Sequence, residues 1–432
     1  MRWRNILERI LIAKALENEY SKELMLLVRN GFVVKRFNYV DEKICREYEC
    51  INLLSEGLLL PGFIDLHVHL RGLELSYKED EESGTKAAAH GGLTVVVDMP
   101  NTVPKIDNVF ALKKKLEELK AKSYVDYGVY VSPPSNKDEL LNMLLIEGVV
   151  GTKIFPQDLY RIPEVAEVFK DLYTKYGRRR IVIVHAENPL MLNECYAGRR
   201  HICRPIESEI SVLNLLKSYS TSWMHIHITH VTNALTLSLA KSYGFTVDTC
   251  PHYLYLDSNN EKEMGCITKV NPPLRSPSTR LTLLNFVKML DAITSDHAPH
   301  SEEEKLNDFG ICPSGISSID IMGSLVLNLI HKGVVSLGDA INLLSKGPAK
   351  ILSLYRWGCL YEGCVASYTV VDLDSELYVD PQHFYSKTKL TPYKTMRLRG
   401  SVKATIVRGY LVYRDNNIVE KPTATPITVF AR

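Results

Sequence analysis

Short hydrophobic runs, rich in β-branched residues, alternate with longer segments of helical period between Pro61 and about Leu354. This alternation is typical of βα units repeated around a parallel sheet. Segments such as ALKKKLEELKAK, KDELLNMLLIE and PEVAEVFKDLYTKYG are long enough to return across the sheet as helices. Eight strands close a barrel of this kind, so the pattern predicts an α/β fold, a (β/α)8 TIM-type barrel. The eight runs are FIDLHVH, LTVVVDMPN, DYGVYVSP, GVVGTKIF, RIVIVHAE, MHIHITHVT, FTVDTCPH and DAITSDHAP.

The two flanks of this region have a different pattern. They contain β-rich pieces such as MLLVRNGFVV, SYTVVDLD and ATIVRGYLVY, with turn signals between them. They predict one small composite β domain formed from both chain ends, with the barrel inserted. We expect an N-terminal helix and the first part of the β domain in 1–60, the barrel in 61–358, and the rest of the β domain with a C-terminal tail in 359–432.

The first twenty residues, MRWRNILERILIAKALENEY, have apolar positions at helical spacing that charged residues interrupt. This pattern predicts an amphipathic helix and argues against a signal peptide. No run of about 18 apolar residues occurs, so no membrane span is expected. The net charge of +2 comes from nearly balanced acids and bases, which argues against nucleic acid and membrane partners. The nine cysteines are scattered without a C-x-x-C pair, so we expect reduced thiols and a cytoplasmic protein.

Polar residues capable of chemistry lie at or just beyond the ends of most of the eight runs. The carboxyl ends of parallel barrel strands converge on one mouth, where the active sites of such barrels are found. A histidine satisfied by a backbone carbonyl is the more common explanation for any one of these residues alone, but it weakens when several coincide. The residues are His67, His69, Asn101, Lys153, His185, His230, His252, Asp296 and His300.

His67 and His69 are two residues apart on a strand, so both imidazoles face one side and could bind one metal ion. Together with His185, His230 and Asp296 they exceed the ligands that one zinc ion needs, which indicates two neighbouring metals.

Lys153 lies where a ligand is wanted, yet an ammonium beside two dications is strongly disfavoured. Carboxylation of the lysine by carbon dioxide would supply an anion with one oxygen for each metal. The competing interpretation is a simple ion pair between Lys153 and Asp158.

The motifs PGFIDLHVHLR, YKED, HGGLTVVVDMPNT, GTKIF, VHAE, HITHVT, TSDHAPH and LLSKGPAKIL occur in this order along the chain. As an ordered set they resemble the amidohydrolase superfamily and, within it, the dihydroorotases. The resemblance covers the barrel and, more loosely, the flanking β segments.

This resemblance implies two zinc ions per chain, bridged by N6-carboxylated Lys153, with Asp296 also acting as the proton shuttle. It places Arg71, Asn101 and His300 on the substrate carboxylate and Asn271 near the substrate ring. The implied reaction is the reversible cyclisation of N-carbamoyl-L-aspartate to L-dihydroorotate in pyrimidine biosynthesis. Candidate protein partners are a second copy of the chain and aspartate carbamoyltransferase. The implied metal ligands are His67, His69, Lys153, His185, His230 and Asp296.

The chain departs from the family pattern at three places. Arg71 is followed by GLELSYKED where Pro-Gly is usual, GISSID near Gly315 lacks the usual glutamate, and Asp158 lies near the position where some bacterial relatives carry a bridging aspartate. Three alternatives stay open. They are another cyclic amidohydrolase (an allantoinase or a dihydropyrimidinase), an inactive homologue that scaffolds a pyrimidine-pathway enzyme, and a barrel whose strand-end histidines are structural.

Overall fold

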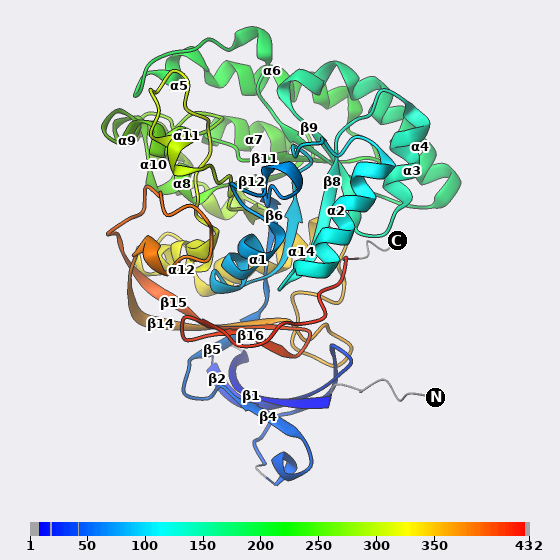
Figure 1. The fold of residues 1–432 in the computed structure, drawn as a ribbon, viewed down its shortest axis with the longest axis vertical. Helices are drawn as coiled ribbons and strands as arrows, with labels where there is room; N and C mark the ends of the chain where they lie inside the picture. The colour runs from blue at the N-terminus through cyan, green and yellow to red at the C-terminus, as the bar shows by residue number, and fades with distance from the viewer. Residues whose placement is uncertain (1–7, 18–19, 42, 428–432) are drawn as a thin grey trace.

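The computed structural model describes residues 8–17, 20–41 and 43–427. Within these ranges, eight parallel strands follow one another around a barrel, each hydrogen-bonded to the next in chain order (Figure 1). All eight predicted strand runs are confirmed, and so is the predicted fold class. The strands are β6 (Phe63–Val68), β7 (Leu93–Asp98), β8 (Asp126–Val131), β9 (Val149–Ile154), β10 (Ile181–His185), β11 (His225–Thr229), β12 (Thr246–Thr249) and β13 (Ala292–Ile293).

The last strand, β13, has only two residues, and the segment after it closes the barrel. Val68 forms a parallel bridge with His297, and the backbone N–H of His69 donates to the carbonyl of His297 at 2.8 Å. The buried Asp65 carboxylate accepts from the backbone N–H of Ser295 at 3.1 Å. The two ends of the barrel sequence therefore meet just below the carboxyl end of β6.

Helices cover the outside of the barrel (Figure 1). The three helices predicted from their sequence period are present as α2 (Val109–Lys122), α3 (Lys137–Leu145) and α4 (Ile162–Tyr176). The remaining helices are α1 (Glu81–His90), α5 (Arg200–Cys203), α6 (Ile206–Leu216), α7 (Ala234–Ser242), α8 (Pro251–Tyr255), α9 (Ser258–Met264), α10 (Pro277–Asn285), α11 (Glu302–Lys305), α12 (Met322–His331), α13 (Leu337–Ile341) and α14 (Gly347–Ile351).

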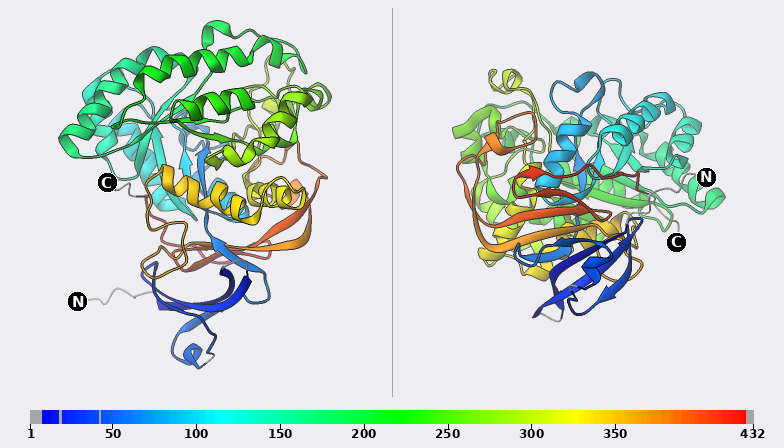
Figure 2. Two further views of the ribbon diagram at one scale, coloured as in Figure 1. Left: turned by 180° about the vertical axis from the view of Figure 1, so that it is seen from behind. Right: turned by 60° about the horizontal axis from the view of Figure 1, so that its bottom comes forward.

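A mixed sheet built from both chain ends lies below the barrel (Figures 1 and 2). Its centre is β5, which pairs antiparallel with β14 and parallel with β1. This confirms the predicted composite β domain. The strands are β1 (Glu8–Glu17), β2 (Tyr20–Arg29), β3 (Phe32–Phe37), β4 (Glu49–Asn52), β5 (Leu58–Pro61), β14 (Tyr368–Tyr378), β15 (Arg397–Val407), β16 (Tyr410–Arg414) and β17 (Asn417–Ile418).

The prediction of an N-terminal helix is wrong for the residues that the structure describes; residues 1–7 and 18–19 lie outside them. Residues 8–17 form β1, which pairs with β2, β4 and β5. Leu11 and Ala13 pack in one hydrophobic cluster, whereas Ile10 and Ile12 pack in another. A strand that is buried on both faces shows no alternation of polar and apolar residues. The spacing of the apolar residues in β1 therefore resembled that of an amphipathic helix.

The expectation of reduced thiols is also wrong, because eight of the nine cysteines, all within the described ranges, form disulfides. The pairs are Cys45–Cys50, Cys195–Cys203, Cys266–Cys312 and Cys359–Cys364, and Cys250 is free. Within each pair the two Cα atoms lie 5.5 to 6.1 Å apart, a distance that a disulfide can bridge. The conformation of the loops brings these cysteines together, and their spacing along the chain does not show it.

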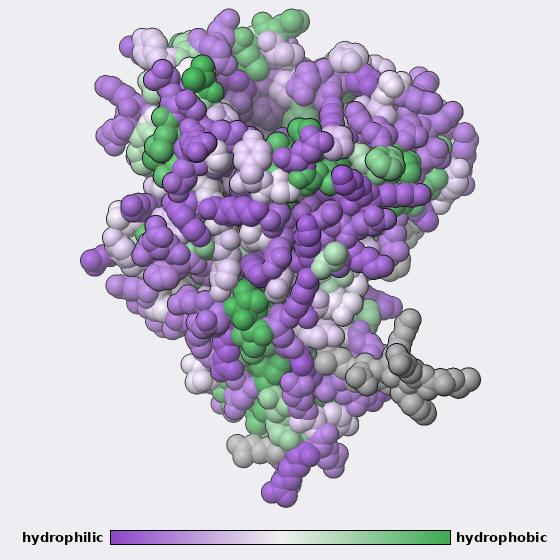
Figure 3. All heavy atoms as spheres, in the orientation of Figure 1, coloured by the Kyte–Doolittle hydropathy of each residue, from purple (hydrophilic) through white to green (hydrophobic). Residues whose placement is uncertain are grey.

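The surface seen in Figure 3 is mostly hydrophilic around the barrel, and a hydrophobic streak runs over the lower, β-sheet part of that face. Within the described residues, no helix combines the length and the apolar character needed to cross a bilayer.

Candidate active site and metal centre

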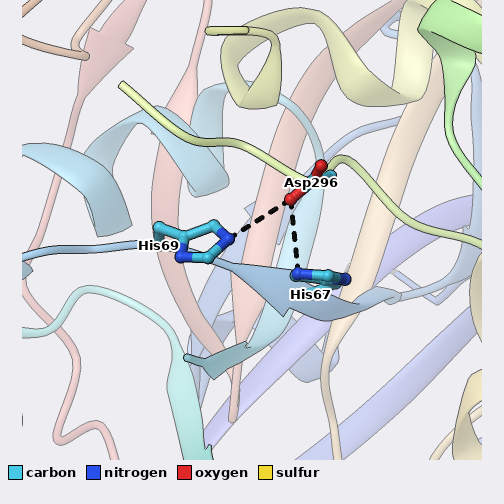
Figure 4. A group of neighbouring side chains, drawn as sticks. All are labelled: His67, His69 and Asp296. Carbon is cyan, nitrogen blue, oxygen red and sulfur yellow. Dashed lines mark hydrogen bonds and ion pairs between the residues drawn. The ribbon is translucent and has the colours of Figure 1, made fainter. Parts of the chain in front are cut away.

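Three side chains from opposite ends of the barrel sequence converge at its mouth (Figure 4). His67 lies on β6, His69 lies just after it, and Asp296 follows β13. The Nε2 atoms of His67 and His69 lie 3.2 and 3.3 Å from Oδ1 of Asp296. All three side chains are buried, and their nitrogen and oxygen atoms lie within 4.8 Å of one another. This group has the ligand types and the spacing of a divalent metal site.

Two more of the predicted histidines join this group. The ring centroids of His67 and His230 are 5.2 Å apart, and those of His230 and His185 are 4.5 Å apart. The four imidazoles therefore form one continuous cluster, drawn from the ends of β6, β10 and β11. Burial lowers the pKa of all four, so they are neutral at pH 7 and each offers a nitrogen lone pair.

Backbone strain marks the same group. Arg71, His230 and Asp296 have φ angles of 58°, 46° and 44°, in the left-handed region that residues with side chains rarely adopt. Each follows the carboxyl end of a barrel strand. Such conformations cost free energy and concentrate at functional sites, where the surrounding structure maintains them.

Neighbouring side chains orient two of the imidazoles. His69 Nδ1 lies 2.7 Å from Oδ1 of Asn101, which leaves Nε2 toward Asp296. His185 Nε2 lies 2.6 Å from Glu187, which leaves Nδ1 for a ligand. Burial opposes ionisation of Glu187, but its contacts with His185 and Arg204 lower its pKa to about 2. Glu187 is therefore an ionised partner of His185.

Lys153, on β9, is completely buried beside this cluster. Among the described residues its Nζ atom has no hydrogen-bond partner, and it lies 5.3 Å from the ring centroid of Phe155. Burial lowers the pKa of Lys153 to about 8. The expected competitor, an ion pair with Asp158, is not formed, because Asp158 lies 3.8 Å from Lys105 and accepts from the backbone N–H of Phe155.

Asp296 takes part in a second group of possible ligands with Cys250 and His252, whose atoms also lie within 4.8 Å of one another. Both ring nitrogens of His252 lack a hydrogen-bond partner within the described residues, and burial lowers its pKa to about 4. Burial would raise the pKa of Asp296, yet its hydrogen bond with His69 and the nearby His252 and Lys153 outweigh burial and lower that pKa. Asp296 is therefore a carboxylate at the centre of the group.

Arg71, Lys78 and His300 lie together next to the histidines. Nη2 of Arg71 is 3.2 Å from Nε2 of His300, and Nε of Arg71 donates to the carbonyl of Pro299. Lys78, from the loop that departs from the family pattern, lies 3.3 Å from Nδ1 of His300 and 2.7 Å from Glu304. Burial and the adjacent Arg71 lower the pKa of His300 to about 3. Arg71 and His300 are therefore in contact with each other, and Asn101 contacts the metal-ligand group through His69.

Asn271 makes a different set of contacts. Its amide oxygen accepts a hydrogen bond from the buried guanidinium of Arg200, which also donates to the carbonyl of Val270 at 2.7 Å. A cis peptide bond joins Asn271 to Pro272. Asn271 lies in the loop between α9 and α10, in the part of the chain that connects β12 to β13. The sequence did not indicate Arg200 as its partner.

Sequence reasoning missed three supporting residues. Glu187 lies two positions after the predicted site residue His185 in VHAE, and Asp248 lies in FTVDTCPH at a position that alternation directs inward. Lys115 comes from the outer helix α2, where its spacing suggests a surface lysine. Its buried ammonium donates to the carbonyl of Arg71 and pairs with Asp98 and Glu81 at 2.7 Å.

Comparison with known proteins agrees with this geometry. Residues 58–412 match the sequence profile of the Amidohydrolase family. Dihydroorotase of Saccharolobus solfataricus is 41% identical over 359 residues, 83% of this chain and 85% of the relative. Dihydroorotase of Methanothermobacter thermautotrophicus is 34% identical over 382 residues, 85% of this chain and 86% of the relative.

Solved structures show the same fold in other amidohydrolases. L-hydantoinase (dihydropyrimidinase) from Arthrobacter aurescens superposes with a TM-score of 0.86 at 22% identity, over 98% of this chain and 100% of that one. The dihydropyrimidinase from Brevibacillus agri superposes with a TM-score of 0.84 at 22% identity, over the same shares of the two chains. The sequence profile and the dihydroorotases that are 34% and 41% identical over more than four fifths of this chain establish that it belongs to the amidohydrolase family, on its dihydroorotase branch.

Proposed function

We propose that the protein is a dihydroorotase that interconverts N-carbamoyl-L-aspartate and L-dihydroorotate for pyrimidine biosynthesis. The observation that carries this proposal is the contact between Arg71 and His300 beside the cluster of His67, His69 and Asp296. A planar guanidinium recognises a carboxylate with two parallel hydrogen bonds. Dihydroorotate carries such a carboxylate, whereas allantoin and dihydrouracil do not.

The residues present fit a pair of zinc ions. Four neutral imidazoles and one carboxylate cluster at the barrel mouth, beside a buried amine that has no hydrogen-bond partner among the described residues. When bound, such metals act as Lewis acids and lower the pKa of water, which is the chemistry that amide hydrolysis needs. The residues that would hold them are His67, His69, Lys153, His185, His230 and Asp296.

Lys153 fits the role of a bridging ligand after carboxylation. Its neutral amine would add to carbon dioxide, forming an N–C bond and releasing one proton, which leaves a carbamate with two oxygens. The absence of a hydrogen-bond partner for Nζ within the described residues is what supports this modification. Asp158, the alternative bridge, is already paired with Lys105.

Each remaining residue has one task in the proposed reaction. Arg71, Asn101 and His300 would hold the substrate carboxylate, and Asn271 would contact the ring from the loop after β12. The oxygen of the Asn101 amide faces His69, so its N–H₂ group would serve as the donor to the carboxylate. Asp296 would hold the proton on Oδ2 while it passes between water and the ring nitrogen, since Oδ1 faces the two histidines.

The decisive experiment combines metal analysis with turnover assays on dihydroorotate, allantoin and dihydrouracil. We expect two zinc ions per chain and turnover of dihydroorotate alone. Turnover of allantoin or dihydrouracil instead would assign the chain to another cyclic amidohydrolase, and a metal-free protein without turnover would favour a scaffolding homologue. A cytoplasmic location, a homodimer and association with aspartate carbamoyltransferase stay predictions, which fractionation and size measurements with and without that enzyme can check.

A further inference from the structure

A column of buried polar side chains runs along the inside of the barrel toward the metal-ligand group. It follows alternate positions on two neighbouring strands, so its members face the same side of the sheet. His227, Thr229 and Asp248 are at most 1% exposed. Polar side chains in such a place are costly unless each has a partner. The members of the column are His225, His227 and Thr229 on β11 and Thr246 and Asp248 on β12.

Asp248 is the acceptor at the centre of the column. Its Oδ1 atom accepts from the backbone N–H of His230 at 2.5 Å. Its Oδ2 atom lies 2.8 Å from Nε2 of His227, and the Thr229 hydroxyl donates to the two oxygens at 3.1 and 3.0 Å. An ionised carboxylate can only accept hydrogen bonds. The Thr229 hydroxyl and Nε2 of His227 therefore both donate their protons in hydrogen bonds to Asp248.

The direction of the Thr229 hydrogen bond determines the tautomer of His67. Nδ1 of His67 lies 2.7 Å from the Thr229 oxygen. Because the Thr229 proton points at Asp248, the Thr229 oxygen must accept, so the proton of His67 is on Nδ1. Nε2 of His67 is then left with its lone pair directed at the position facing Asp296, 3.2 Å away.

The hydrogen bonds of the column continue from His227 toward the other end of the barrel. Nδ1 of His227 lies 2.9 Å from the Thr246 oxygen, which lies 2.7 Å from Nε2 of His225. With one ring proton, placed on Nε2 toward Asp248, His227 would accept at Nδ1 from Thr246, and Thr246 would accept from His225. His225 borders a cavity of about 430 Å³ at the amino ends of the strands. One carboxylate thus sets the protonation pattern of the column.

We propose that Asp248 is a positioning residue that acts through Thr229 on the tautomer of His67 and directly on the strained backbone of His230. The inference deepens the proposed function, because it concerns two residues of the proposed metal site. Without the column, His67 could place its proton on Nε2, where it would block the lone pair that binds metal. Partners of metal-ligating histidines commonly contribute a factor of 10 to 100 in metal affinity.

The test uses four variants of the full-length protein. T229V removes the hydroxyl at nearly constant volume, T229S keeps it, and D248N removes the charge. T249V is the matched control, because Thr249 is also buried on β12 but donates to the carbonyl of Val231, outside the column. Zinc affinity is measured by competition with a chelator. The tautomer of His67 is measured by ¹⁵N NMR of the metal-free protein.

We expect T229V and D248N to lose about 10- to 100-fold in zinc affinity, whereas T229S and T249V stay within about threefold of the unaltered protein. In the metal-free protein, ¹⁵N shifts should show His67 protonated on Nδ1, and T229V should move that proton to Nε2. Unchanged affinity and tautomer in T229V would overturn the inference, even if D248N failed to fold. An unaltered protein that binds no zinc would instead overturn the proposed metal centre, so the two failures are distinguishable.

Discussion

Arg71 and His300 lie in contact, Nη2 to Nε2 at 3.2 Å, although 229 positions separate them in the sequence. Arg71 follows the first barrel strand and His300 follows the last. Their contact depends on the closure of the barrel through the bridge between Val68 and His297. The proposed carboxylate pocket therefore forms only when the two ends of the barrel sequence have met.

Replacing Arg71 with Met should raise KM for dihydroorotate by about 100-fold, because the substrate carboxylate would lose charge-assisted hydrogen bonds worth about 3 kcal/mol. Zinc content should stay the same, since Arg71 is not among the proposed ligands. R71K is the matched control: it keeps the charge but lacks the planar fork, so an intermediate KM is expected. Steady-state kinetics and metal analysis check both variants, and normal KM in R71M would refute the substrate assignment.

Replacing Lys153 with Gln should abolish metal binding and activity together. Glutamine keeps much of the side-chain length but can neither add carbon dioxide nor bridge two cations as an anion. The carbamate itself is checked by ¹³C NMR after the protein is loaded with zinc under ¹³C-labelled carbon dioxide. Two zinc ions in K153Q would shift the bridge to another anion, and D158N would then be the next variant to analyse.

The stability of the protein should rise with pH between about 7 and 10 through Lys305. Burial, together with Lys269 and Arg200, lowers the folded-state pKa of Lys305 to about 7 from an ordinary value of 10.5. In this window the unfolded chain binds a proton that the folded protein does not, so unfolding becomes less favourable as pH rises.

The K305M variant lacks this titration and isolates the effect. Between pH 7 and pH 9.5, the free energy of unfolding should rise by about 3 kcal/mol more in the unaltered protein than in K305M. Denaturant titrations at both pH values measure the difference. Parallel pH profiles for the two proteins would show that the Lys305 pKa is not lowered.

Breaking the Cys266–Cys312 disulfide should destabilise the loop that follows β13. The bond closes a segment of 46 positions, for which the loss of chain entropy on crosslinking is about 4 kcal/mol in the unfolded state. C312S should therefore lower the melting temperature, whereas C359S, which opens a segment of only 5 positions, should lower it less. Equal melting temperatures in the variants and the unaltered protein would contradict the pairing.

Much of the barrel was predictable because its strands combine continuous burial with a polar residue at one end. FIDLHVH shows both features, and β6 begins at its first residue. The N-terminal strand was not predictable, since β1 packs apolar residues on both faces. An apolar run that is buried on both faces lacks the alternation that distinguishes a strand from a helix.

The proposed ligands could be selected from the sequence because strand ends of a parallel barrel must converge. Their supporting residues could not. Lys115 reaches Arg71 from the buried face of the outer helix α2, and Asp248 reaches His67 through Thr229 on the neighbouring strand. Such contacts depend on register and side-chain direction, which spacing along one chain does not specify. The disulfides escaped prediction for the same reason.

The composite sheet has a consequence for protein synthesis. β5 ends at Pro61, but its antiparallel neighbour β14 begins at Tyr368. A ribosome makes the N-terminal strands first, so those strands wait for more than two thirds of the chain to be translated before one edge of β5 is covered. An uncovered edge is a template for pairing between nascent chains. The order of translation thus leaves the amino-terminal strands as the part of this protein that most needs protection while it is being made.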